Sequence, residues 1–207
     1  HSPCAGVVKK IERVRTAQGY PADALVIERD AESGERYAYP GLDPAQASSE
    51  EIVARVRECG IVGLGGATFP TAVKLVPPEG MTPECVILNG AECEPYLTCD
   101  DRLMREHADE IACGAYCLMR AARVRHCYIG IERNKPEAIE AMQRAAAGYE
   151  GMKVCVLRTK YPQGGEKQLI AAILGREVPS GALPVSVGAI VDNVATAYAV
   201  QQAVVEG

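Results

Sequence analysis

A glycine-rich stretch in the first half of the chain carries residue types that bind anions. Gly63, Gly65 and Gly66 come just before Phe69, and Lys74 follows. Glycine permits positive φ and lets a ligand approach the main chain closely. A run of unshielded N–H groups then forms a concave anion site, usually for phosphate, to which Lys74 adds a positive charge. The stretch predicts a phosphate-bearing ligand, and a tight turn packed under Phe69 is the alternative.

Two familiar glycine loops do not match this stretch. The dinucleotide-binding fingerprint needs a third glycine where this chain has Thr68. The nucleoside-triphosphate loop needs Gly-Lys-Ser/Thr, which is missing. The residue types therefore favour a phosphate site of another kind.

Three further polar stretches follow apolar segments that are typical of buried strands. They cover residues 89–96, 159–167 and 191–196. Loops after parallel strands gather at one edge of a sheet, where ligands bind. The candidate contacts offer hydrogen bonds to ring N–H groups or ribitol hydroxyls, and Phe69 and Tyr161 offer flat apolar surface for a ring system. These contacts are Asn89, Glu92, Glu94, Tyr161, Glu166, Asp192 and Asn193, and the two-glycine turn at Gly164 and Gly165 is a second possible approach for a phosphate or a ring.

The polar loops also have a structural interpretation, in which Asn193 caps a helix, Asp192 holds a turn, and Glu92 and Glu94 are solvated. None of the loops contains a histidine, a nucleophile elbow or a cluster with metal-ligand spacing. A site with phosphate donors and a ring surface but no acid–base pair suits a redox cofactor, because the cofactor supplies the reactive atoms.

The elements that must position these loops follow two patterns. Residues 1–45 predict a small β subdomain with strands at 6–14, 24–28 and 35–39 and a hairpin-type connection at 30–34. Its expected role is structural packing. From residue 46 to 207, strands and helices alternate, which predicts an α/β domain with a largely parallel sheet flanked by helices.

The α/β part begins with a capping box, Ser48 and Glu51, and its first helix ends at Gly60. Asn134 is the expected cap of a later helix with Pro136 in its first turn. The expected strands are 85–89, 126–131, 153–157 and 187–191, and the other expected helices are 100–122, 166–174 and 193–205.

Composition bounds the class of protein. Apolar residues make up 48% and charged residues 24% of 207, as in ordinary globular proteins. The net charge of −5 argues against nucleic-acid binding, and no apolar run is long enough for a membrane-spanning helix. Nine cysteines without a C-x-x-C pair predict reduced thiols in a cytoplasmic protein. The sequence starts without Met, in the middle of what looks like a strand, so we expect an excised fragment.

The glycine stretch and the three loops resemble the RnfC family of the Rnf electron-transport complex, which is similar to the flavin- and NADH-binding subunit of respiratory complex I. The resemblance covers essentially the whole chain. The segments that carry it are Gly63-Leu-Gly65-Gly66-Ala-Thr-Phe69-Pro70-Thr71 with Lys74, Asn89-Gly-Ala-Glu92-Cys-Glu94-Pro95-Tyr96, Tyr161-Pro-Gln-Gly164-Gly165-Glu166-Lys167-Gln168 and Val191-Asp192-Asn193-Val194-Ala-Thr196.

The resemblance implies a flavin mononucleotide (FMN) site in residues 46–207 that accepts hydride from NADH. It implies that Glu94, Glu166 and Phe69 act at the nicotinamide side. The implied cofactor contacts are Gly63, Leu64, Gly65, Gly66 and Lys74 at the phosphate end, Asn89 and Glu92 at the flavin border, and Tyr161, Gly164, Val191, Asp192, Asn193 and Thr196 around the rest of the pocket. Leu64 stands where the complex I relative has arginine, and Gly165-Glu166 where it has paired glutamates.

The family also implies partners and a location. Its ferredoxin-like region with two 4Fe–4S clusters has a C-x-x-C-x-x-C pattern that this chain lacks, so electrons would pass to clusters elsewhere. The segment from Ser2 to Val7 resembles part of the family's small β-sandwich, of the barrel-sandwich type. Partner subunits would hold the protein at the cytoplasmic membrane face.

Two alternative functions remain open from the sequence: a cofactor-free docking module of a redox complex and a nicotinamide-dependent dehydrogenase.

Overall fold

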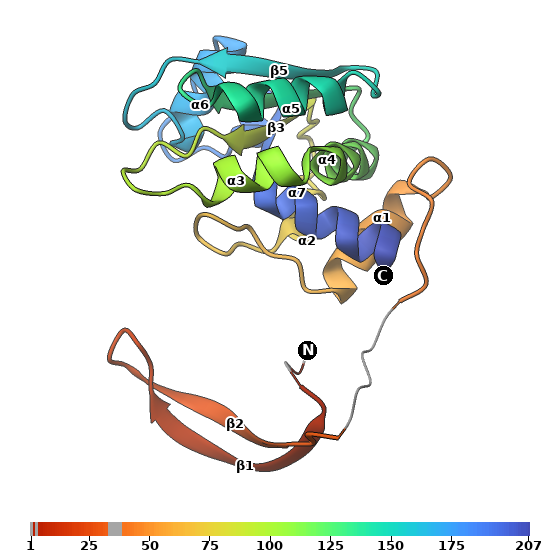
Figure 1. Ribbon diagram of the computed structural model, residues 1–207, viewed down its shortest axis with the longest axis vertical. Coiled ribbons are helices and arrows are strands. Elements are labelled where there is room, and N and C mark those ends of the chain that lie inside the picture. Colours follow the sequence, from red (N-terminus) through yellow and green to blue (C-terminus); the bar gives the residue numbers. More distant parts are fainter. Residues whose placement is uncertain (1, 3, 33–38) are drawn as a thin grey trace. The chain divides into compact units, whose positions relative to one another are not determined.

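The computed structural model of the chain describes residues 2, 4–32 and 39–207 and divides it into two compact units, His1–Ala38 and Tyr39–Gly207 (Figure 1). The expected domain boundary at residue 45 therefore differs from the boundary between the units. Residues just after 39 belong to the second unit, because the Leu42 N–H donates to the Val204 carbonyl at 2.7 Å. The functions expected of the two domains stay predictions.

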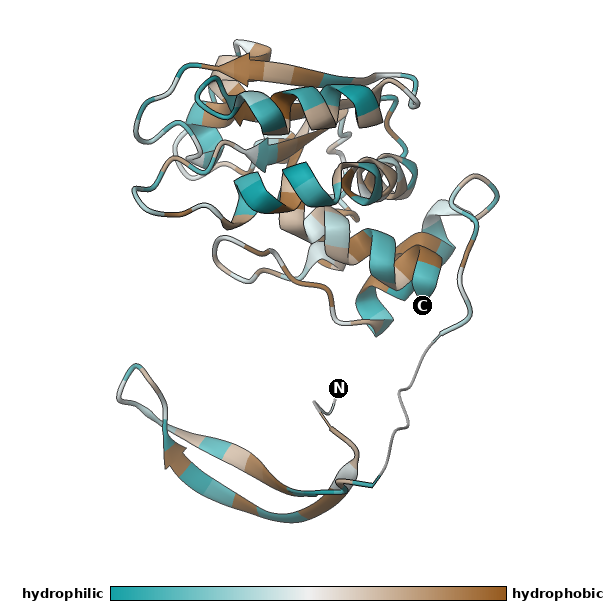
Figure 2. Cartoon of the chain, in the orientation of Figure 1, coloured by the Kyte–Doolittle hydropathy of each residue, from teal (hydrophilic) through white to brown (hydrophobic). Residues whose placement is uncertain are grey.

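The first unit is a two-stranded antiparallel ribbon, β1 (Gly6–Arg15) and β2 (Pro21–Arg29). Apolar and polar residues are mixed along both strands without strict alternation (Figure 2). The two strands expected at 6–14 and 24–28 are confirmed. The expected connection at 30–34 and strand at 35–39 extend into residues 33–38, which lie outside the described residues.

The second unit contains a four-stranded sheet in the order β5-β4-β3-β6 in which every pairing is parallel. The strands are β3 (Cys85–Gly90), β4 (His126–Glu132), β5 (Met152–Leu157) and β6 (Ala189–Asn193). The predicted parallel sheet is confirmed, but the last strand starts later than expected. Residues Pro184–Val187 instead form a 3₁₀ turn, η1, which Gly188 ends with φ +80°. Asp192 and Asn193 are therefore strand residues at the sheet's carboxyl edge.

Helices cover both faces of this sheet. Along β3, Val86 and Leu88 face the larger core, whereas Cys85 and Ile87 face the smaller core on the side of α6 (Glu166–Leu174). Four helices each contribute several residues to the larger core: α1 (Ser49–Glu58), α4 (Ala108–Ala122), α5 (Pro136–Ala146) and α7 (Val194–Gln201). Alternating side chains are buried on both sides, so the strand reads as a continuous apolar run.

Local signals explain where the helices begin and end. The capping box of Ser48 and Glu51 is present in α1, and α6 ends at Gly175 as expected, with φ +66°. The single helix expected at 100–122 is wrong, because His107 has φ −131° and ψ 39° and separates α3 (Cys99–Glu106) from α4. The expected Asn134 cap is also wrong, since Lys135 occupies the N-cap of α5.

Two further helical details differ from the sequence-based expectation. The short helix α2 (Thr71–Lys74) follows the glycine-rich stretch and was not expected. The last helix, expected at 193–205, is α7 followed by a π-helical segment, η2 (Gln202–Glu206). All nine cysteines are free thiols.

Candidate functional site

The glycine-rich stretch forms a closed loop between two extended segments. Val62 and Pro70 form an antiparallel bridge. The Gly63 N–H donates to the Phe69 carbonyl at 2.8 Å, and the Thr71 N–H donates to the Ile61 carbonyl at 3.0 Å. These bonds fix both ends of residues 63–69, which we call the glycine loop.

The glycine loop is attached to the first turn of α7. The Leu64 N–H donates to the Oγ1 of Thr196 at 2.9 Å, and Thr196 is fully buried. Gly65 has φ +74°, and a Cβ there would lie 3.1 Å from the Nδ2 of Asn193, so a side chain would be both strained and crowded. The N–H groups of Gly63 and Leu64 are thus both hydrogen-bonded within the protein. An anion could bind only to the N–H groups that follow them in the loop.

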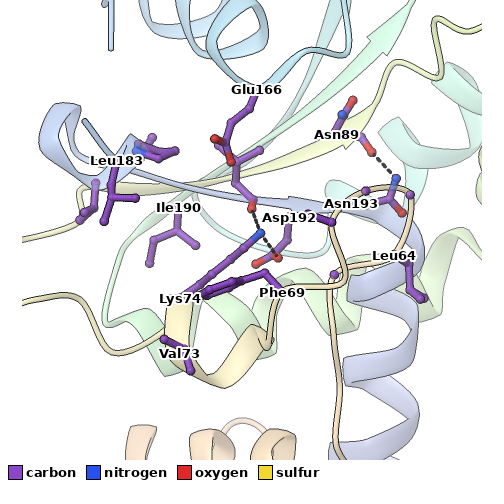
Figure 3. A pocket seen from close by; sticks show the side chains of 18 of the residues that line it. Leu64, Phe69, Val73, Lys74, Asn89, Glu166, Leu183, Ile190, Asp192 and Asn193 are labelled. Carbon is purple, nitrogen blue, oxygen red and sulfur yellow. Dashed lines mark hydrogen bonds and ion pairs between the residues drawn. The ribbon is translucent and has the colours of Figure 1, made fainter. Parts of the chain in front are cut away.

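A cavity of about 580 Å³ opens beside the glycine loop, and we call it the glycine-loop cavity (Figure 3). A Cβ on Gly66 would meet no atom within 4 Å. Most of the wall is apolar, and its charged side chains are Lys74, Glu166 and Asp192. The wall comes from Gly63–Phe69, Val73, Lys74, Val76–Pro78, Asn89, Gly164, Glu166, Leu183–Val185 and Ala189–Asn193.

Lys74 and Asp192 form an ion pair at the wall of this cavity. The Lys74 Nζ donates to the Oδ1 of Asp192 at 3.2 Å and to the Val191 carbonyl at 2.8 Å, as Figure 3 shows. The second bond ties α2 to β6, the edge strand of the sheet. Burial raises the pKa of the Asp192 carboxyl to about 6, although Lys74 acts to lower it.

Asn193 connects three segments at the carboxyl edge of the sheet. Its Oδ1 accepts from the Ala195 N–H at 2.7 Å and so caps α7. Its Nδ2 donates to the Oδ2 of Asp100 at 2.7 Å and to the Asn89 carbonyl at 3.3 Å. Burial raises the pKa of Asp100, and the hydrogen bond from Asn193 acts in the opposite direction. The cap that the sequence suggested is therefore present, together with contacts that it did not suggest.

Gly164 is held from two sides, by a residue of β3 and by a residue of the loop after it. The Nδ2 of Asn89 donates to the Gly164 carbonyl at 2.8 Å, and the Gly164 N–H donates to the Sγ of Cys93 at 3.2 Å. A Cβ on Gly164 would lie 3.3 Å from that sulfur. The two-glycine turn before α6 is therefore tied to the end of β3.

A second cavity, of about 440 Å³, lies beside the acidic stretch after β3, and we call it the acidic-loop cavity. Glu92 borders it, but its carboxylate accepts from the N–H groups of Asp100 at 2.8 Å and Asp101 at 3.0 Å, at the start of α3. Glu92 and Tyr96 have φ of +45° and +67°, and such backbone strain gathers at functional sites. The lining residues are Glu92–Thr98, Asp101, Glu132, Asn134, Lys135 and Thr159–Tyr161.

A buried charged pair supports the floor of the acidic-loop cavity. Glu132 is 2% exposed, its Oε1 accepts from the Lys160 N–H at 3.1 Å, and its Oε2 lies 3.6 Å from the Nζ of Lys135. The Lys135 Nζ also donates to the Ala91 carbonyl at 2.8 Å. The pair therefore joins the ends of β3, β4 and β5.

The structure divides the residues that the sequence suggested between the two cavities. Glu92, Glu94 and Tyr161 line the acidic-loop cavity, and Thr196 lines neither but supports the glycine loop. The others line the glycine-loop cavity: Gly63, Leu64, Gly65, Gly66, Phe69, Lys74, Asn89, Gly164, Glu166, Val191, Asp192 and Asn193.

Sequence reasoning did not find several lining residues. Leu183–Val185 and Ile190 form an apolar wall of the glycine-loop cavity, and Glu132 and Lys135 border the other cavity. Leu183 is 55% exposed, and a leucine before a proline carries no chemical signature of a site. Glu132 could have been predicted from the sequence, because it lies at the end of a strand that was expected to reach the carboxyl edge of the sheet.

Comparison with known proteins places this geometry in context. Residues 56–202 match the model of the Nuo51 FMN-binding domain. The chain is 48% identical over 208 residues, 99% of its length, to a subunit of the ion-translocating oxidoreductase complex of Rhodobacter capsulatus. It is 50% identical over 187 residues, 89% of its length, to a subunit of the proton-translocating ferredoxin:NAD(+) oxidoreductase complex of Clostridium ljungdahlii. It spans 40% of the length of each relative.

A solved structure shares the fold. A chain of the NAD+-reducing [NiFe]-hydrogenase in the H2-reduced state matches with a TM-score of 0.65 at 24% identity, over 78% of this chain and 32% of that one. Within the described residues, no helix combines the length and the apolar character that crossing a membrane requires.

Proposed function

The chain belongs to the family of the Nuo51 FMN-binding domain, and from this we propose that its glycine-loop cavity binds flavin mononucleotide. The observation that carries the proposal is the cavity itself. It has apolar walls, a lysine, and an open approach to the main chain at Gly66. A volume of about 580 Å³ falls in the range of about 300–1,000 Å³ that is typical of sites for small organic ligands.

The residues of the cavity fit the parts of this ligand. Phe69, Leu183 and Ile190 offer apolar surface for the ring system. The Oδ2 of Asp192 is buried without a hydrogen-bond partner among the described residues, so an acceptor is available to the ligand. Lys74 is the cation beside it and would face the phosphate, together with the N–H groups that follow Leu64.

Nicotinamide dinucleotide would bind on the open side of the same cavity. Phe69 is 48% exposed and Glu166 is exposed at the start of α6, so both can contact a second ligand. Glu94, an exposed residue of the acidic-loop cavity, would orient that ligand by accepting a hydrogen bond. Bound flavin accepts a hydride from NADH and releases electrons one at a time.

We place this activity in a larger redox complex. Curated relatives are named as subunits of ion-translocating oxidoreductase complexes. We propose that the chain is the flavin-binding part of such a subunit, that iron–sulfur clusters outside these residues accept its electrons, and that partner subunits hold it peripherally at the cytoplasmic face of the membrane.

The test is a spectrum of the purified protein after FMN is added and unbound FMN is removed by desalting. We expect retained flavin absorbance that NADH bleaches under anaerobic conditions. Retained flavin that NADH leaves oxidised would support the flavin site and contradict the proposed nicotinamide site. No retained flavin would contradict the proposal and favour a docking module without cofactor.

A further inference from the structure

The carboxylate of Asp192 is buried, and a single ion pair on one of its oxygens compensates only part of the cost of burying it. The residue is 3% exposed and its side chain is fully buried. Among the described residues, Oδ1 has the ammonium of Lys74 at 3.2 Å and Oδ2 has no hydrogen-bond partner. A buried carboxylate costs free energy unless it is paired and hydrogen-bonded. The ionised form of Asp192 is therefore stabilised only while the ammonium of Lys74 stays beside it.

Lys74 is placed where a ligand can reach it. Its side chain is 27% exposed and lines the glycine-loop cavity, whereas Asp192 lies behind it. An ammonium has three N–H donors, and the bonds to the Val191 carbonyl and to Asp192 use two of them. The lysine can thus turn toward an anion in the cavity without leaving its position on α2.

The other charged group facing Asp192 acts against its ionisation. Glu166 at the start of α6 lines the same cavity and raises the pKa of Asp192. Burial is the largest cause of that rise, and Lys74 is the one group that opposes it. Moving Lys74 away would therefore raise the pKa of Asp192 further, above about 6 and toward neutral pH.

We propose that Lys74 and Asp192 are the pair by which the site recognises a phosphate monoester: the ligand phosphate takes the ammonium of Lys74 from Asp192, and the Asp192 carboxylate takes up a proton from solution. The ion pair of the Lys74 ammonium passes from the carboxylate to the phosphate. The inference rests on the proposed binding of FMN in this cavity. It predicts a difference between FMN and riboflavin, because riboflavin lacks the phosphate and leaves the pair intact.

The test is the number of protons taken up per bound ligand. Calorimetric titrations of the protein with FMN at pH 7, in two buffers with different ionisation enthalpies, give this number directly. We expect uptake of about 0.5 proton or more per FMN and none per riboflavin. The phosphate of FMN has a pKa of about 6 and can itself exchange a proton on binding. The Asp192→Asn variant retains only that contribution, so we expect the uptake of about 0.5 proton to appear as the difference between wild type and variant, and no uptake with riboflavin in either protein.

A second measurement covers the case in which Asp192→Asn does not fold. Proton uptake on binding requires the wild-type affinity for FMN to fall as pH rises, by about threefold or more per pH unit around neutrality, while the affinity for riboflavin stays constant. FMN that binds with no proton uptake, or with the same pH dependence as riboflavin, would overturn the inference and leave the flavin site in place. Failure of both ligands to bind would instead overturn the proposed function.

Discussion

The two cavities at the carboxyl edge of the sheet are built in different ways. The glycine-loop cavity has walls fixed by buried groups, with Thr196 fully buried behind Leu64 and Asp192 buried behind Lys74. The acidic-loop cavity has a rim of exposed side chains, and Tyr161 is 72% exposed. A prebuilt apolar cavity lowers the cost of ordering a ligand. The first cavity therefore suits a retained cofactor, and the second suits a group that contacts a substrate transiently.

The use of carboxylates shows the same difference. In the glycine-loop cavity, Asp192 keeps one oxygen without a hydrogen-bond partner among the described residues. In the acidic-loop cavity, both oxygens of Glu92 accept from the first turn of α3, so this carboxylate already has a structural role. A ligand in the glycine-loop cavity can therefore still hydrogen-bond to Asp192, whereas the acidic-loop cavity offers a ligand mainly the exposed Glu94.

Filling the glycine-loop cavity should have the largest effect on FMN. The change Gly66→Leu places a side chain where a Cβ meets nothing within 4 Å, and the φ of Gly66 lies outside the left-handed region. We expect the dissociation constant for FMN to rise about 100-fold, or about 3 kcal/mol, measured by quenching of flavin fluorescence. Gly148→Leu is the matched control, because Gly148 is exposed after α5 and its Cβ would lie 3.7 Å from the nearest atom. Equal affinities in the two variants would move FMN out of this cavity.

Removing the charge of Asp192 should change how stability depends on pH. The folded pKa is raised to about 6 from an ordinary value of 3.8, so the folded state holds this proton more tightly than the unfolded state. This one carboxyl therefore lowers the stability of the wild type by about 3 kcal/mol as pH rises from 4 through 6, and Asp192→Asn lacks that contribution. Urea unfolding at several pH values should show the variant gaining stability relative to wild type over this interval. A difference that is constant with pH would contradict the assigned burial effect.

Loosening the glycine loop should have a moderate effect. Thr196→Val keeps the shape of the side chain but removes the acceptor of the Leu64 N–H. The bond is part-buried, so its loss should cost about 0.5–1.5 kcal/mol, the net value of an ordinary hydrogen bond. We expect a loss of that size in urea unfolding, with about tenfold weaker FMN binding. Thr82→Val, at an exposed position, is the control. Unchanged FMN affinity in Thr196→Val would show that the loop needs no attachment to α7.

A substitution in the acidic-loop cavity should have the smallest effect, and it should change the KM for NADH rather than the affinity for FMN. Glu94→Gln removes the charge of an exposed residue while keeping its shape. We expect the KM for NADH to rise about threefold to tenfold, equivalent to about 0.5–1.5 kcal/mol, with FMN affinity unchanged. Glu150→Gln, exposed after α5, controls for net charge. A loss of FMN affinity in Glu94→Gln would contradict the division of roles between the cavities.

The sequence predicted the sheet and the edge at which the loops meet, because buried strands such as β3 and β4 are continuous apolar runs. It missed the break between α3 and α4, since nothing in the residues around His107 stops a helix as glycine or proline does. It also placed the last strand too early, because Val187 extends the apolar run although Pro184–Val187 form a 3₁₀ turn.

The candidate site was less predictable than the fold, because its partners are distant in sequence. A lysine after a glycine-rich stretch suggested a free cation, but Lys74 is paired with Asp192, 118 residues away. Likewise the Leu64 N–H is used by Thr196, 132 residues away. Residue types and spacing identify which groups lie near the edge of a sheet, whereas the hydrogen bonds among them depend on tertiary packing.

Hydrogen–deuterium exchange of the protein with and without FMN tests the central claim most directly, because it locates the ligand in one of the two cavities. We expect protection by FMN in residues 61–71, 164–166 and 183–193, which contain most of the lining of the glycine-loop cavity, and no change in residues 94–98 or in β1 and β2. Protection confined to residues 92–101 and 132–135, around the acidic-loop cavity, would contradict the assignment of the flavin site.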